Sequence, residues 1–204
     1  MFEVQDLKFA TLATVSRCGM IWFNEDVVTV DMVFHNYLTR LSNVIYGSEE
    51  SDSQQANAFT PVGTPLEPSE SSRVSPELQS QRDVVAILKP YFATNGLVQR
   101  CLEFVADKEH IMDFTASRAI YALLSMMNQI VREIHRYNAG HPDFPMGYDQ
   151  IENFVSKSLV YAMLWSLTGD SKKKHREELG EFIRSASNIR LPSHSGVPLI
   201  DFEV

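Results

Sequence analysis

The chain has 204 residues, 44% of them hydrophobic, and a formal net charge of −8. This length and apolar content are enough for one or two globular domains with a buried core. An acidic balance argues against a nucleic-acid groove or an anionic membrane surface as the partner, because both attract lysine and arginine.

The sequence also carries compartment signals. Only two cysteines occur, Cys18 and Cys101, and they form no CxxC pair, which is typical of free thiols in a reducing compartment. The N-terminal MFEVQDLKFA has neither the basic nor the apolar segment of a secretion signal, and no window of about 18 residues is apolar enough to span a bilayer. The sequence therefore predicts a cytoplasmic protein without membrane insertion.

The first part of the chain, residues 1–24, contains two short extended pieces at 2–4 and 20–23, joined by small residues. Two strands do not make a stable sheet by themselves, so other strands are missing or the region packs on something else. From Asp26, a good N-cap, apolar residues recur at helical spacing as far as Ile45. We expect an amphipathic helix of about five turns, ended by the glycine that follows.

Residues 47–74 are rich in Ser, Pro, Gly and acidic residues and poor in periodic apolar residues. Such a segment buries too little to offset its ordering entropy, and we expect a disordered insert. Its Thr-Pro and Ser-Pro steps are either plain linker or phosphorylation sites.

Helical patterns fill the chain from residue 75 to about 188. Ser75 followed by Pro76 is a helix start, and the helix should end or kink at Pro90. A shorter helix follows, and Thr115 is expected to cap a long one whose apolar stripe includes Met126 and Met127. We interpret both methionines as core residues and not as a docking surface.

The last two helices follow the loop at 139–147, which is interrupted by two prolines. One begins near Tyr148 and closes at Gly169. Asp170 or Ser171 is expected to cap the last helix, which is more strongly charged. About six helices and a strand fragment together predict a helical domain attached to a piece of an α/β domain.

Motifs for chemistry are absent from the sequence. No GxxxxGK[ST], GxGxxG, GxSxG or HExxH pattern occurs, so the chain lacks a complete phosphate loop, dinucleotide turn, nucleophile elbow or zinc helix. Six histidines are scattered along the chain, which favours ordinary surface or packed histidines over a shared metal site.

Two cationic features remain as candidates. Arg17 stands in a segment of small residues before the apolar piece at 20–23, and its planar, always-charged guanidinium suits phosphate recognition or pairing with a carboxylate. Cys18 beside it is either a thiol of lowered pKa or a small buried residue. The cations at 172–176 form a solvated helix face or a patch for an acidic partner or phosphate.

Several segments together resemble the cytoplasmic dynein heavy chain family. They are FEVQDLKFATLATVSRCGMIWF, VFHNYLTRL, QRDVVAILKPYFATNGLVQRCLEF, EHIMDFTASRAIYALLSMMNQ, YNAGHPDFPM and VYAMLWSLTGDSKKKHREELGEFIR. The resemblance covers essentially the whole chain except the acidic insert. The resemblance is to the second AAA+ module of the motor ring. It implies a mainly α fold, with a helical AAA+ small (lid) subdomain attached to the last strands of an α/β AAA+ large subdomain.

The resemblance also implies the domain boundaries. They are 1–24 for the end of the large subdomain, 25–46 for a connecting helix, 47–74 for the insert, 75–188 for the lid and 189–204 for a linker into the third module. The chain would then be a fragment in which Met1 is internal, and the nucleotide-gripping half, with its Walker A and Walker B motifs, lies outside it.

Three residue roles follow from the same resemblance. Arg17 resembles an arginine finger that acts in trans on the ATP site of the neighbouring first module. Arg118, in FTASRAIYALL, matches a sensor arginine that faces the module's own nucleotide. Gln5 lies roughly where the other sensor residue is expected, and the usual asparagine is missing, which fits a module that binds ATP without hydrolysing it.

At the level of the whole protein, the resemblance implies an ATP-driven, minus-end-directed motor that uses ATP and Mg²⁺ in the cytoplasm on microtubules. Its partners would be neighbouring AAA+ modules, microtubules, dynein intermediate and light intermediate chains, and dynactin. The fragment alone is expected to bind no cofactor and to be inactive. The alternative is a free-standing helical scaffold for protein interactions, with no nucleotide role.

Overall fold

The computed structural model describes residues 8–17, 27–45, 75–189, 191 and 199. This part of the chain is helical and contains no strand, only an isolated antiparallel bridge between His110 and Ser171. The helices are α1 (Leu12–Arg17), α2 (Val30–Asn43), α4 (Pro76–Leu88), α5 (Leu97–Ala106), α6 (Ala116–Gly140), α7 (Tyr148–Thr168) and α8 (Lys173–Ala186). The predicted mainly α class is confirmed, while the expected strands at 2–4 and 20–23 lie outside the described residues.

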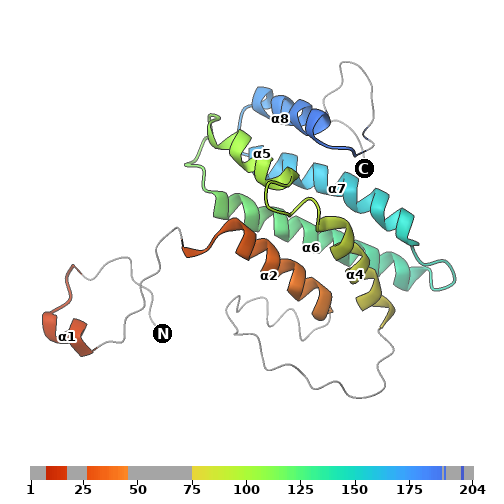
Figure 1. Ribbon diagram of the computed structural model, residues 1–204, viewed down its shortest axis with the longest axis horizontal. Coiled ribbons are helices and arrows are strands. Elements are labelled where there is room, and N and C mark those ends of the chain that lie inside the picture. The colour runs from red at the N-terminus through yellow and green to blue at the C-terminus, as the bar shows by residue number, and fades with distance from the viewer. Residues whose placement is uncertain (1–7, 18–26, 46–74, 190, 192–198, 200–204) are drawn as a thin grey trace.

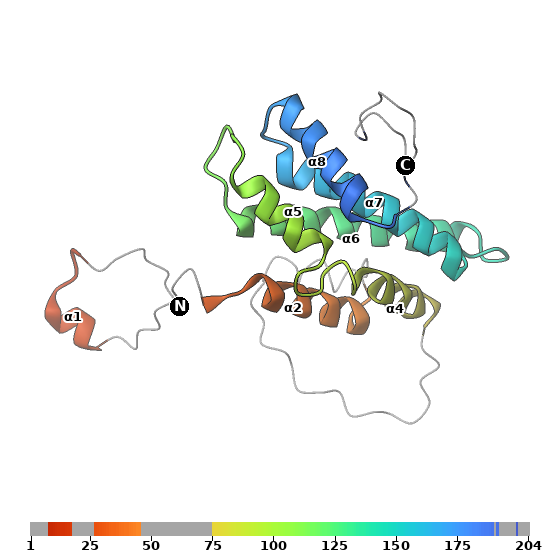
Figure 2. The same ribbon diagram turned by 45° about the horizontal axis from the view of Figure 1, so that its top comes forward.

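The two longest helices, α6 and α7, run antiparallel through the middle of the body (Figure 1). Helices α2 and α4 cover one side of this pair, and α8 lies on the opposite side, where it packs on α5 and α7 (Figure 2). One continuous apolar core joins these helices. Its largest fully buried side chains are Phe34, Leu41, Leu88, Ile120, Leu123, Met127, Ile134, Ile151, Leu159, Met163, Leu164 and Leu167.

The methionines of α6 belong to this core, as the sequence predicts. Met127 is fully buried, and Met126 packs against the core as a partly buried residue. A second anchor is aromatic: the ring of Phe34 in α2 stacks on that of Phe92 with centroids 4.6 Å apart. Such contacts fix α2 on the body even though the insert separates it in sequence from the other helices.

The start of α4 is as predicted. The Ser75 hydroxyl accepts a hydrogen bond from the Leu78 amide at 3.2 Å, and Pro76 is the first helical residue. The helix ends at Leu88, before Pro90, which has no amide hydrogen to continue it.

The ends of α2 differ from the prediction. The helix begins at Val30, where the Thr29 hydroxyl accepts from the Met32 amide at 3.3 Å, and Asp26 lies outside the described residues. It stops at Asn43, so Ile45 is beyond it. The predicted five turns are too long because the cap was placed three residues too early and the helix ends before the expected glycine.

Side chains from α4 hold the last turn of α2. The Gln81 side-chain amide, fully buried, donates to the carbonyl oxygens of Leu41 at 2.5 Å and Val44 at 2.8 Å. Arg82 Nε donates to the Ser42 carbonyl at 3.4 Å. The last carbonyls of a helix have no partner within it, so these contacts replace a local C-cap. The end of α2 and the residues of α4 that contact it are therefore close in space, although residues 46–74 separate them in the sequence.

None of the described helices is both long enough and apolar enough to cross a membrane.

Candidate functional site

Three segments meet at one end of the helical body: the α5–α6 loop, the first turn of α6, and the turn between α7 and α8 (Figure 1). The backbone joins them, because the Ile111 amide donates to the Asp170 carbonyl at 3.2 Å, beside the His110–Ser171 bridge. This junction carries Arg118, a candidate from the sequence, and brings two further ionisable residues beside it.

His110 is the buried centre of the junction, with only 3% of its side chain exposed. Its Nε2 lies 3.0 Å from the Val105 carbonyl oxygen, and its Nδ1 lies 2.9 Å from Asp170 Oδ1 and 3.1 Å from the Ser171 hydroxyl. A carbonyl and a carboxylate only accept hydrogen bonds. Both ring nitrogens of His110 thus face hydrogen-bond acceptors.

Asp170 is shared between His110 and Arg118. One carboxylate oxygen faces His110, and the other accepts from Arg118 Nη2 at 3.1 Å. Burial by itself raises the pKa of Asp170, but the hydrogen bond and charge of His110 and the charge of Arg118 outweigh it, so the pKa lies below its usual value. The carboxylate is thus held ionised as a fixed counter-charge.

Arg118 extends from the first turn of α6, where a cation opposes the positive end of the helix dipole. The Asp170 carboxylate compensates for this position. The arginine side chain remains 40% exposed, and a guanidinium has five N–H donors, so one bond to Asp170 leaves donors available to an anion from outside. Thr115 stands at the N-cap, as predicted, but makes no capping side-chain hydrogen bond.

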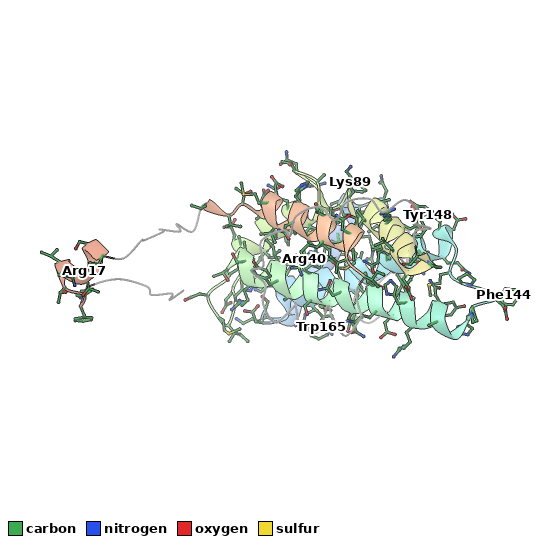
Figure 3. The ribbon with its side chains drawn as sticks, turned by 90° about the horizontal axis from the view of Figure 1, so that it is seen from below. Arg17, Arg40, Lys89, Phe144, Tyr148 and Trp165 are labelled. Atoms are coloured by element: carbon green, nitrogen blue, oxygen red, sulfur yellow. The ribbon has the colours of Figure 1, made fainter. Side chains whose placement is uncertain are left out.

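Arg17 is the last residue of α1, a short helix within the segment of small residues (Figure 3). The helix is started by Thr11, whose hydroxyl accepts from the Thr14 amide at 3.2 Å. Within the described ranges the Arg17 side chain is exposed and no hydrogen bond or ion pair holds it. A cation in the last turn of a helix interacts favourably with the helix dipole, so the position of Arg17 is also explained without a ligand.

Of the three predicted site residues, the structure describes Arg17 and Arg118 and does not bring these two together. Gln5 and Cys18 lie outside the described residues, and Arg118 contacts Asp170 on the body while Arg17 stands on α1. In the part of the chain with assigned structure, no group of three or more His, Cys, Asp or Glu residues can hold a metal ion.

The basic cluster at 172–176 is neutralised locally. Lys172 Nζ lies 2.8 Å from a Glu109 carboxylate oxygen, and Lys173 and Lys174 lie 3.7 and 3.8 Å from glutamates one turn further along α8. Arg176 covers the ring of Trp165 at 4.8 Å and donates to carbonyl oxygens at the end of α7. The solvated-face interpretation fits this arrangement better than a free cationic patch.

Asp170 and Ser171 do not cap α8, contrary to prediction. Lys172 occupies the N-cap position and makes no side-chain capping bond. The Asp170 carboxylate is taken by His110 and Arg118, and Ser171 contacts the His110 ring. The partners are 52 to 61 residues apart in the sequence, so no local pattern could have revealed the junction.

Comparison with known proteins places the chain in a family. The model of the dynein heavy chain AAA lid domain matches residues 88–204, more than half of the chain. The chain belongs to the dynein heavy chain AAA lid domain family. The match to this dynein lid family covers α5 to α8 completely, so Arg118, His110 and Asp170 all fall within it.

Cytoplasmic dynein heavy chains are similar to the whole chain. Identity is 51% over 204 residues for the protein of Drosophila melanogaster, 39% over 206 residues for that of Caenorhabditis elegans, and 37% over 225 residues for that of Dictyostelium discoideum. All of this chain is covered in each comparison, but it spans only 4 to 5% of the length of those relatives. The resemblance to cytoplasmic dynein heavy chains is confirmed, and the free-standing scaffold is not favoured.

Proposed function

We propose that this chain is the lid-bearing part of the second AAA+ module in the ring of an ATP-driven, minus-end-directed microtubule motor that works in the cytoplasm. The observation that carries the proposal is the match of the dynein lid family to helices α5 to α8 of the body. The proposed boundaries are 1–24 for the end of the large subdomain, 25–46 for the connecting helix, 47–74 for the insert, 75–188 for the lid and 189–204 for the linker.

Arg17 is proposed to act as an arginine finger in trans on the ATP site of the first module. Its guanidinium would stabilise the charge that develops on the transferred γ-phosphoryl group. An exposed arginine at the end of α1, with no hydrogen bond or ion pair to other described residues, supports this role. Fingers of this kind are worth roughly 10³–10⁵-fold in rate in GTPases.

Arg118 is proposed to sense the module's own nucleotide, together with Gln5. In support, Arg118 is half-exposed and keeps donors free at the end of the body where three segments converge. The described residues fit a phosphate contact through arginine. ATP and Mg²⁺ belong to the parent motor in this proposal, and the fragment alone is proposed to bind neither.

The helical body is proposed to pass motion around the ring as a rigid unit. A single core connects α2 with α4 to α8, so displacement at one end is transmitted to the other. Neighbouring modules are the direct partners. Microtubules, dynein intermediate and light intermediate chains, and dynactin are the partners proposed for the parent chain, and the fragment alone should not hydrolyse ATP.

The test of the finger is Arg17→Ala in the full motor. Microtubule-stimulated ATP turnover should fall by at least about 100-fold, a conservative share of the range seen for such fingers. Arg136→Ala is the matched control, because this arginine is also exposed on a helix and, among the described residues, pairs with Glu133 one turn earlier. Near-normal turnover of the Arg17 variant would remove the finger from the proposal and leave the lid assignment intact.

A further inference from the structure

Asp170 is the member of the junction that the sequence predicted least. It lies in the turn between α7 and α8 and faces the exposed Arg118 in the first turn of α6. Its own position is fixed from two directions: the His110 ring holds Oδ1, and the Ile111 amide holds its backbone carbonyl. His110 is anchored in turn by the Val105 carbonyl at 3.0 Å. The carboxylate is therefore a rigid point against which a long, mobile side chain can be oriented.

Arg118 needs such an orientation. An arginine side chain loses considerable rotamer freedom when it is ordered, and this loss weakens any anion contact that it makes. The contact with Asp170 uses Nη2 alone, at 3.1 Å, and the side chain stays 40% exposed. The contact with Asp170 thus already restricts part of the rotamer freedom of Arg118. The remaining N–H groups of its guanidinium can still donate to an oxygen ligand.

We infer that Asp170 is a positioning residue that pre-orders Arg118 for contact with a nucleotide phosphate. This inference rests on the proposed sensor role of Arg118. Asp170 does not touch the nucleotide itself; it acts through the arginine, and His110 holds it in place for that purpose.

The experiment uses the full motor with photoreactive 8-azido-ATP and Mg²⁺, and mass spectrometry quantifies the labelled peptides of each module separately. The nucleotide concentration that half-saturates labelling of the second module is measured for Asp170→Asn, Arg118→Ala and the double variant. Asp170→Asn should raise this concentration about threefold to fivefold, since a partly exposed ion pair contributes up to a factor of about 5. Arg118→Ala should raise it roughly tenfold or more, because a charged hydrogen bond is lost.

The double variant decides how Asp170 acts. It should match Arg118→Ala, because a residue that acts through the arginine has no effect once the arginine is gone. Glu109→Gln is the control: Glu109 pairs with Lys172 across the same two loops at 2.8 Å, is largely exposed and does not face Arg118. It should leave labelling unchanged. Asp170→Glu keeps the charge but displaces it, and should raise the concentration about twofold only when Arg118 is present.

Different failures have different meanings. If Arg118→Ala leaves labelling unchanged, the sensor role fails and the inference falls with it. If Arg118→Ala weakens labelling but Asp170→Asn does not, or strengthens it, the sensor role stands and the positioning role is overturned. Equal effects of Asp170→Asn with and without Arg118 overturn it as well. Should Asp170→Asn melt below the assay temperature, Asp170→Glu decides by the same comparison.

Discussion

Gln81→Leu tests the contact that fastens α2 to α4. The leucine side chain has nearly the same size, so packing is largely kept while the amide donors are removed. The Leu41 and Val44 carbonyl oxygens then lose their hydrogen bonds at 2.5 and 2.8 Å, and no donor within α2 can replace them.

The magnitude follows from these two acceptors. A buried polar group left without a partner costs about 1–3 kcal/mol, and the second acceptor, which is only partly buried, about 1 kcal/mol. The free energy of unfolding should fall by about 2–4 kcal/mol, which corresponds to roughly 4–16 °C in Tm for a protein of this size.

Urea denaturation of the chain, followed by circular dichroism at 222 nm, measures the change. Gln79→Leu is the matched control, because Gln79 lies two residues earlier in α4, is exposed, and its amide donates to the Asp83 carboxylate one turn later at 3.1 Å. This control should change stability by less than about 0.5 kcal/mol. If the two variants unfold at the same urea concentration, the side chain of Gln81 does not cap α2 in any energetically meaningful sense, and our account of the α2 end is wrong.

Two further predictions concern the junction and the core. The pKa of Asp170 is lowered in the folded state, so the folded protein binds a proton at this carboxylate less readily than the unfolded chain does. The ionised carboxylate therefore stabilises the fold above about pH 4. This stabilisation is lost as the pH falls through the pKa of Asp170 in the folded state. The stability difference between the wild type and Asp170→Asn, measured by urea titration from pH 6 to pH 3, should therefore shrink at the acid end; a constant difference would contradict the assignment. Leu159→Ala, at a fully buried position of α7, should cost about 2–5 kcal/mol in the same assay, while the exposed Glu152→Ala on that helix should cost less than about 0.5 kcal/mol. A loss below about 1 kcal/mol for the leucine variant would show that the core relaxes around the site.

Most helices could be predicted from the sequence because their signals are local. Ser75 with Pro76 starts α4, Pro90 limits it, and the apolar stripe of α6 buries Met127 as expected. The resemblance to dynein heavy chains could also be recognised from the sequence, since it depends on the order of residues and on nothing spatial. The family match confirms it.

Helix ends and the junction could not be predicted, because their partners come from elsewhere in the chain. The end of α2 is set by Gln81, which lies 40 residues after Leu41, and the role of Asp170 is set by His110 and Arg118 on other segments. A local rule assigned Asp170 to a helix cap, since aspartate is a good cap wherever nothing competes for it. His110 and Arg118 compete for it here, and only tertiary packing brings them within hydrogen-bonding distance. The sequence by itself thus determined the helices and the family, whereas the folded structure decided which charges are shared.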